Sequence, residues 1–261
     1  MVASSSDKLT VEVSEHTALI RINNPPGNTW DLETLQALRS LMEQLNLERS
    51  IYSLVLTGSG EKFMSAGADL KMIAAGGKSA AADMASHFGA AFSALARFRG
   101  VSIAAINGYA FGGGLECAMA CDIRICSTSA SLALPEAAVG LLPCAGGTHL
   151  LKKLVGEAWA KRMILFGERV DAETALRIGL VQEVTAPESL LARALALAKQ
   201  ASRQSPVSVE ACKQLITDSA ATLEEALAFE RIAYARLFDG PDQKEGVSAF
   251  LEKRLPRWSS D

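Results

Sequence analysis

Short apolar runs alternate with helical stretches along this chain, and that alternation restricts its fold more than any other feature. Four runs read as strands, and all but DIRICS are free of charge: IYSLVLTG (51–58), VSIAAING (101–108), DIRICS (122–127) and SLAL (131–134). Between them lie a helical pattern after Asp31, which is placed to cap it, and an alanine-rich helical stretch that continues to about Arg99. Buried strands that alternate with helices predict an α/β fold with covered sheets.

The two ends of the chain carry different patterns. LTVEV (9–13) and TALIRI (17–22) alternate apolar with polar residues, which predicts an N-terminal hairpin. After about residue 147 the pattern is mostly helical, interrupted by GLVQEVT (179–185), and from about Ser202 it is helical throughout. We therefore predict a core over residues 1–201 and a helical region over 202–261, which closes its own core or packs on another subunit.

The composition of the chain argues against several classes of function. With 261 residues, a net charge of −3 and no basic stripe, the chain is not expected to bind nucleic acid or to cross a membrane. The first residues, MVASSSDKLT, do not resemble a signal peptide, and the histidines show no metal spacing. Five scattered cysteines read as small buried hydrophobes in a reducing, cytoplasmic setting: Cys117, Cys121, Cys126, Cys144 and Cys212.

The segment AFGGGLECAMACDIR (110–124) places Glu116 between three glycines and an apolar run. Glutamates are rarely buried unless they are paired, so this carboxylate is either a satisfied structural group or a chemical one. The glycines open a helix directly after a strand, where free backbone amides stabilise negative charge on a ligand oxygen. Tight packing of helix on strand explains three glycines equally well. The segment lacks the features of a dinucleotide fingerprint, a phosphate loop or a serine elbow.

Two further segments favour chemistry over packing. SAGADLK (65–71) repeats the design of a strand, a small-residue loop and a helix start, and two converging amides make an oxyanion hole. LALPEAAVG (132–140) places Glu136 after a proline in another apolar setting. Alone, Glu136 would suit a helix start, but two such glutamates beside glycine or proline loops favour an acid/base pair.

Five segments in order resemble the crotonase (enoyl-CoA hydratase/isomerase) superfamily: FMSAGADLK, IAAINGYAFGGGLECAMACDIRI, PEAAVGLLPCAGGTHLL, GERVDAETALRIGLVQEV and EGVSAFLEKR. The resemblance implies an α/β fold built as a spiral of βαβ units with a C-terminal helical region. It also implies a homotrimer or a dimer of trimers.

The same resemblance implies the site. The amides of Ala68 and Gly113 would hold the thioester oxygen of an acyl-CoA, and Glu116 and Glu136 would be the catalytic carboxyls. The residues implied to bind the substrate and its CoA are Ala66, Ala68, Asp69, Leu70, Lys71, Gly112 and Gly113, with Phe250 and Lys253 reaching a CoA that is often bound mainly to a neighbouring subunit. CoA would enter as part of the substrate, so no separate cofactor and no metal are expected.

The implied reaction is the hydration of a trans-2-enoyl-CoA to a 3-hydroxyacyl-CoA. Glu116 would orient and deprotonate the water that adds to C3, and Glu136 would exchange the proton at C2. A Δ3,Δ2-enoyl-CoA isomerase, which can use a single acid/base at Glu136, and an acyl-CoA decarboxylase are the alternatives within the superfamily. A non-catalytic binding protein would be expected to lose a glutamate or the oxyanion glycines. The acyl group itself stays open.

Cys144 departs from the superfamily pattern, and Trp30 allows two interpretations. Cys144 stands where the superfamily usually has glycine. Its thiol could narrow the acyl site or alter the bound water there, but we predict structural packing rather than catalysis. Trp30 is expected either to shape the wall of the substrate site or to belong to the core.

Overall fold

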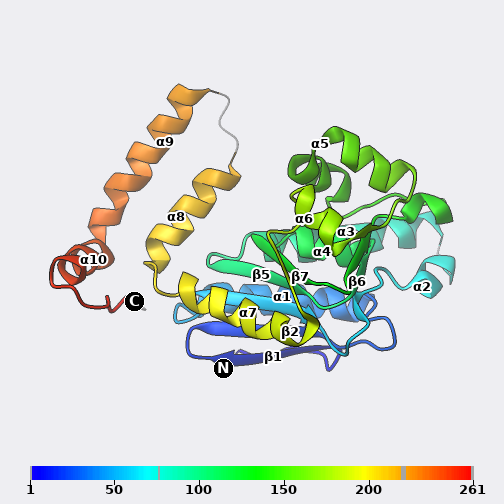
Figure 1. Ribbon diagram of the computed structural model, residues 1–261, viewed down its shortest axis with the longest axis horizontal. Helices are drawn as coiled ribbons and strands as arrows, with labels where there is room; N and C mark the ends of the chain where they lie inside the picture. The colour runs from blue at the N-terminus through cyan, green and yellow to red at the C-terminus, as the bar shows by residue number, and fades with distance from the viewer. Residues whose placement is uncertain (1, 76, 219–221, 260–261) are drawn as a thin grey trace.

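Two sheets and the helices around them form the body of the protein (Figure 1). The structure is a computed structural model that describes residues 2–75, 77–218 and 222–259. The predicted core and the predicted helical region each include residues outside this described part, namely 1 and 76 for the first, and 219–221, 260 and 261 for the second.

The larger sheet has six strands. Its order is β1 (Leu9–Ser14), β2 (Thr17–Ile22), β3 (Ser53–Gly58), β5 (Val101–Ile106), β7 (Ile123–Ser127) and β10 (Glu183–Thr185). The antiparallel pair β1 and β2 is the predicted hairpin, and every later neighbour pairs in parallel. The parallel α/β class predicted from the apolar runs is confirmed.

The smaller sheet has four short strands, and only one of them was predicted. Its order is β4 (Phe63–Ser65), β6 (Tyr109–Phe111), β8 (Ser131–Ala133) and β9 (Val170–Asp171). The segment after Gly58 contains β4, and the segment before the three glycines contains β6. Strands of two or three residues are too short for an alternating pattern to show in sequence.

The helices of the first half follow the prediction with one correction. The helix α1 (Leu32–Leu47) begins at Asp31, whose carboxylate accepts a hydrogen bond of 2.9 Å from the backbone N–H of Thr34. The alanine-rich stretch is not one helix: it divides into α2 (Leu70–Ala75) and α3 (Lys78–Ala96). Gly77 has extended backbone angles (φ −94°, ψ −167°), so a new helix starts after it.

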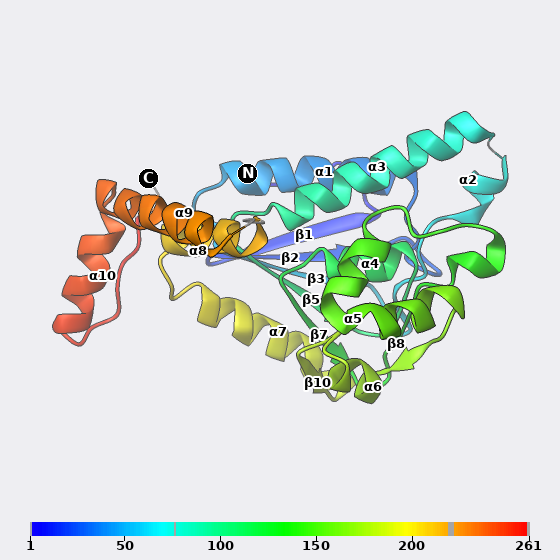
Figure 2. The ribbon, with the colours of Figure 1, turned by 90° about the horizontal axis from the view of Figure 1, so that it is seen from above.

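Helices cover both faces of the larger sheet. In Figure 2, α1 and α3 lie on one side of the strands and α7 (Pro187–Ala201) on the other. On the α7 side, Leu190, Ala194 and Ala198 join a core formed by Leu19, Val55, Ile103, Ala105 and Ile125 from the strands. The remaining elements of this part are α4 (Gly113–Met119), the 3₁₀ turn η1 (Glu136–Val139), α5 (Gly147–Leu165) and α6 (Ala172–Arg177).

The C-terminal helices extend away from the sheets in both views (Figures 1 and 2). They are α8 (Pro206–Thr217), α9 (Leu223–Arg236), η2 (Leu237–Asp239) and α10 (Asp242–Leu251). The helical prediction is correct as far as Leu251, but the described residues after it, 252–259, form no helix. Lys213 on α8 holds the body through its Nζ, which donates to the carbonyl oxygens of Phe98 (2.6 Å) and Gly100 (3.1 Å) and to the Asp122 carboxylate (2.8 Å). The helix α9 buries none of its residues.

The cysteine prediction is right for three positions and wrong for two. Cys117, Cys121 and Cys126 are buried, whereas Cys144 and Cys212 are exposed, because Cys144 lies in the segment between η1 and α5 and Cys212 on the projecting α8. Within the described ranges, no helix is long and apolar enough to cross a membrane.

Candidate active site

A cavity of about 860 Å³ opens beside the strand ends of the smaller sheet. Its walls come from the segment that leads into α2, from α3, from the start of α4, and from residues 135–144. It brings together every site residue predicted within the first 201 residues: Ala66, Ala68, Asp69, Leu70, Lys71, Gly112, Gly113, Glu116 and Glu136.

Phe250 and Lys253 are not part of this cavity within one chain. Phe250 lies on α10 with 82% of its surface exposed, and Lys253 follows that helix. In both views α10 and α2 are at opposite ends of the molecule (Figures 1 and 2). The predicted role of these two residues stays a prediction, and it requires a second copy of the chain.

Two backbone amides face the cavity without a protein acceptor in the described part of the chain. Ala68 pairs with Trp30 in a parallel bridge, in which Trp30 donates to the Gly67 carbonyl and Asp69 donates to the Trp30 carbonyl, both at 2.9 Å. That pattern leaves the N–H of Ala68 free. Gly113 is the first residue of α4, and its N–H is one of those that a helix cannot satisfy internally.

Gly67 allows the two amides to approach one another. Its φ is +96°, and a Cβ added there would lie 2.7 Å from the Phe111 carbonyl oxygen and 3.3 Å from the Gly113 nitrogen. A side chain at this position would therefore push the Ala68 loop away from the start of α4. The small residues of this loop are evident from the sequence, but the particular role of Gly67 is not.

Glu116 is buried, with 2% of its surface exposed, and its carboxylate is held by backbone. The Oε1 atom accepts hydrogen bonds of 2.8 Å from the N–H groups of Ala145 and Gly147. Burial raises the pKa of this carboxyl, while the two amides oppose that shift. A Cβ at Gly147 would lie 2.9 Å from Oε1, so the glycine pair of CAGG fits closely around the carboxylate.

Glu136 has a different environment. It is the first residue of η1, and its Oε2 atom is buried without a hydrogen-bond partner in the part of the chain that the structure describes. Its Oε1 lies 3.1 Å from the position that a Cβ of Gly112 would take, so the carboxyl lies against the glycine that precedes Gly113. Burial, reinforced by the charge of Glu116, raises the pKa of Glu136 to about 7.

The arrangement therefore combines two hydrogen-bond donors with two carboxyls in different environments. Donors that converge on one point stabilise an oxygen on which negative charge develops. Carboxyls whose environments differ are suited to opposite halves of a proton transfer. Among the described residues, no group of three or more acidic, histidine or cysteine side chains is placed to hold a metal.

Cys144 borders the cavity, whereas Trp30 lies in the core. Cys144 lines the cavity and is exposed, which corrects the prediction that it packs structurally. Burial of its sulfur and the charges of Glu116 and Glu136 raise the pKa of its thiol to about 11, so it is protonated at neutral pH. Trp30 is fully buried and packs edge-on against Phe92, which assigns it to the core.

The fold and this cavity together define an acyl-CoA enzyme of the crotonase class, and comparison with known proteins identifies the family. The family model described as enoyl-CoA hydratase/isomerase matches residues 12–261. The chain therefore belongs to the enoyl-CoA hydratase/isomerase family.

Individual relatives cover nearly the whole chain. The structure of Pseudomonas aeruginosa DspI is 60% identical with a TM-score of 0.94, over 97% of each chain. The short-chain-enoyl-CoA hydratase of Clostridium acetobutylicum is 35% identical over 95% of this chain and 96% of its own. The carnitinyl-CoA dehydratase of Salmonella arizonae is 38% identical over 92% of this chain and 93% of its own. The family thus includes several related reactions on CoA thioesters.

Proposed function

We propose that this protein is an enoyl-CoA hydratase. One observation carries the proposal: two carboxyls with different environments border the same cavity as the free amides of Ala68 and Gly113. The C. acetobutylicum relative, named as a short-chain-enoyl-CoA hydratase, supports the same reaction. No separate cofactor is proposed, since CoA arrives with the substrate.

In the proposed mechanism the thioester oxygen accepts hydrogen bonds from Ala68 and Gly113. Glu116, ionised, takes a proton from a water molecule whose oxygen bonds to C3, and electrons of the C2–C3 double bond move toward the thioester. Glu136, protonated, gives its proton to C2 as the charge on the thioester oxygen collapses. Each carboxyl then returns to its starting state by exchanging a proton with solvent, so that one water has been added.

The direct test is hydration of crotonyl-CoA, followed as loss of the enoyl thioester absorbance. A pH series adds a sharper expectation. Since Glu136 must be protonated and its pKa is raised to about 7, kcat/KM is expected to fall as pH rises above about 7. Because Glu116 must be ionised and its pKa is raised by burial, kcat/KM also falls on the acid side. A rate that keeps rising up to about pH 9 contradicts the assignment of Glu136 as a proton donor.

The Gly67→Ala variant tests the oxyanion hole. The added methyl group meets the Phe111 carbonyl oxygen and crowds the Gly113 nitrogen, so the two amides separate. Loss of one such donor typically lowers kcat by about 10²–10³-fold. Gly60→Ala is the matched control, because Gly60 also has a positive φ (+78°) but open space around it. Equal losses in both variants would show that backbone strain, rather than the separation of the amides, is responsible.

We also propose assembly into a homotrimer or a dimer of trimers through α8–α10. Large apolar side chains are exposed there, including Phe229 (54%), Ile232 (51%) and Phe250 (82%), and such patches usually mark protein contacts. Assembly would let Phe250 and Lys253 reach a CoA bound mainly to a neighbouring subunit. Sedimentation at micromolar concentration is expected to give a trimer or hexamer, and a monomer would overturn this part of the proposal. The cytoplasmic location stays a prediction.

A further inference from the structure

An aromatic row crosses the smaller sheet and consists of Lys62, Phe63, Tyr109, Phe111 and Arg169. Phe63 on β4 meets the ring of Tyr109 on β6 edge-on, with the ring centroids 5.5 Å apart. Tyr109 stacks on Phe111, two residues further along β6, at 5.3 Å. A cation lies over each end: the Lys62 Nζ is 5.4 Å from the Phe63 centroid, and the Arg169 guanidinium is 5.0 Å from that of Phe111. The mechanism proposed above uses none of these side chains.

The aromatic row ties together strands that backbone pairing joins only briefly. β4 and β6 have three residues each, and their pairing changes register within β4. Phe63 and Tyr109 are partners in that pairing, so their ring contact runs directly between the two strands. Arg169 reaches Phe111 across β8, where the partner of Phe111 is the small Ala133. Because such cross-strand ring and cation contacts stabilise a sheet, the relative position of these strands depends on the row as well as on hydrogen bonds.

Both β4 and β6 end at the proposed oxyanion hole. Two residues separate the end of β4 from Ala68, and one residue separates the end of β6 from Gly113. The backbones are also in close contact there, because a Cβ added to Gly114 would lie 2.3 Å from the Ser65 carbonyl oxygen. A displacement of β6 relative to β4 therefore changes the spacing of the two amides.

We propose that the aromatic row is a positioning element that fixes the spacing of the Ala68 and Gly113 amides, with Tyr109 at its centre. None of its five side chains lines the active-site cavity, so it acts through the two strands and not on the substrate. The proposal rests on the proposed function in that these amides hold a thioester oxygen. The amides matter most when negative charge develops on that oxygen, so a change in their spacing lowers kcat more than it weakens binding.

The test is Tyr109→Ala, with Tyr109→Phe as the matched control that keeps the ring. A catalytic group misplaced by about 1 Å can lose about 10²-fold in rate, so Tyr109→Ala is expected to lower kcat for crotonyl-CoA by about 10- to 100-fold. Butyryl-CoA binding, measured by calorimetry, should stay close to that of the wild type. Tyr109→Phe should keep both the wild-type kcat and the wild-type binding.

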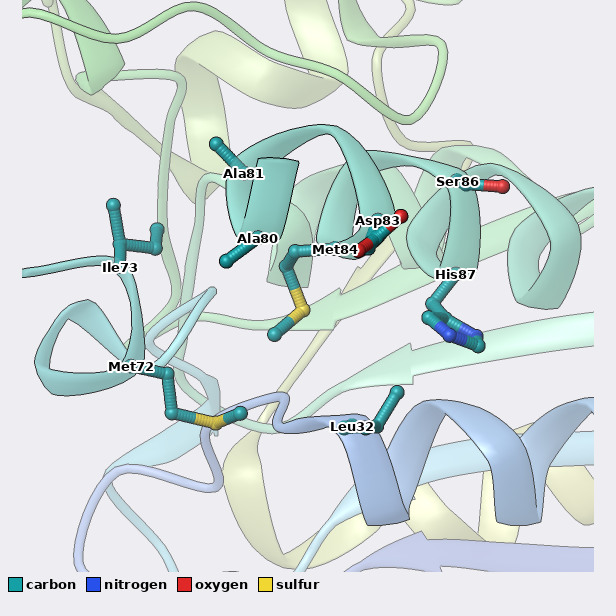
Figure 3. Close-up of a pocket in the computed structure, with 9 residues that line it drawn as sticks. All are labelled: Leu32, Met72, Ile73, Ala80, Ala81, Asp83, Met84, Ser86 and His87. Atoms are coloured by element: carbon teal, nitrogen blue, oxygen red, sulfur yellow. The ribbon is translucent and has the colours of Figure 1, made fainter. Parts of the chain in front are cut away.

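His87→Ala is a second control, because it removes a ring that is half-buried but outside the row. His87 lies on α3 and lines a cavity of about 390 Å³ between α2, α3 and the start of α1 (Figure 3). This variant is expected to keep the wild-type kcat. A loss in His87→Ala equal to that in Tyr109→Ala would show a general effect of losing a ring and would overturn the proposal.

The infrared frequency of a bound thioester carbonyl separates positioning from stability and from turnover. Hydrogen bonds from two aligned amides weaken the C=O bond, so butyryl-CoA labelled with ¹³C at this carbonyl should absorb at lower frequency when bound to the wild type than when free. Tyr109→Ala is expected to reduce that shift, whereas Tyr109→Phe and His87→Ala keep it. A wild-type kcat and shift in Tyr109→Ala, an equal loss in Tyr109→Phe, or a wild type without the shift each overturns the proposal.

Arg169→Gln decides the question if Tyr109→Ala does not fold, because Arg169 is exposed at the end of the row. A cation over an exposed ring is worth about a two- to fivefold change in an equilibrium, so this variant is expected to lower kcat by about that factor and to reduce the carbonyl shift. A wild-type kcat and shift in Arg169→Gln would then overturn the proposal. A wild type that shows the shift but does not hydrate crotonyl-CoA counts against the proposed function instead, and the carbonyl comparison still decides the positioning role.

Discussion

Glu116→Gln is expected to lower kcat for crotonyl-CoA hydration by about 10²–10⁴-fold. The amide oxygen of glutamine can still accept the hydrogen bonds from Ala145 and Gly147, so the cavity keeps its shape while the water loses its base. Turnover is measured by the loss of enoyl absorbance, and binding of butyryl-CoA by calorimetry. We expect binding and the melting temperature to stay close to those of the wild type.

An exposed glutamate provides the control for this substitution. Glu188 lies in the first turn of α7, outside the cavity, so Glu188→Gln should leave kcat unchanged. If Glu116→Gln retains hydration within about tenfold of the wild type, water activation does not depend on Glu116.

Glu136→Gln is expected to lower kcat about as much as Glu116→Gln does, by about 10²–10⁴-fold, but for a different reason. The variant keeps a polar group beside Gly112 but has no carboxyl proton to give to C2. The fall in rate above about pH 7 should disappear with it, since that limb is assigned to the raised pKa of Glu136.

Deuterium exchange separates the roles of the two glutamates. In deuterated water the wild type is expected to exchange the C2 protons of butyryl-CoA, which carries no double bond to hydrate. Glu136→Gln should lose this exchange, whereas Glu116→Gln should retain it. The reverse result would interchange the two roles. A protein that exchanges at C2 but never hydrates would point instead to the isomerase alternative, which needs one acid/base group.

The sequence predicted those helices and strands that a local residue pattern marks. Apolar runs of six or more residues marked the central strands, and Asp31 marked the start of α1. Strands as short as β4 and β6 carry no periodicity, and the alanine-rich stretch conceals the restart at Gly77, because alanine suits a helix on either side of it. These errors changed the number of elements but not the fold class.

The sequence indicated which residues belong to the candidate site, but not which residues contact them. The glycine and proline loops indicated which backbone amides and carboxyls matter. However, Glu116 is held by amides 29 and 31 residues further along the chain, and no local pattern reveals such partners. The α3 wall was missed for a related reason: Phe88, Met84 and Ala81 read as an ordinary apolar helix face until the fold places them opposite the two loops.

The position of α7 also bears on how this protein is made. The sheet face that contains Leu19, Val55, Ile103 and Ile125 is covered by a helix that begins only at Pro187. A ribosome delivers the strands first, so during synthesis this face has no cover of its own until that helix emerges. Exposed apolar strands invite association with other chains. The six strands of the larger sheet are therefore all made before this face can be covered, and the cover comes only when residues 187–201 have been added.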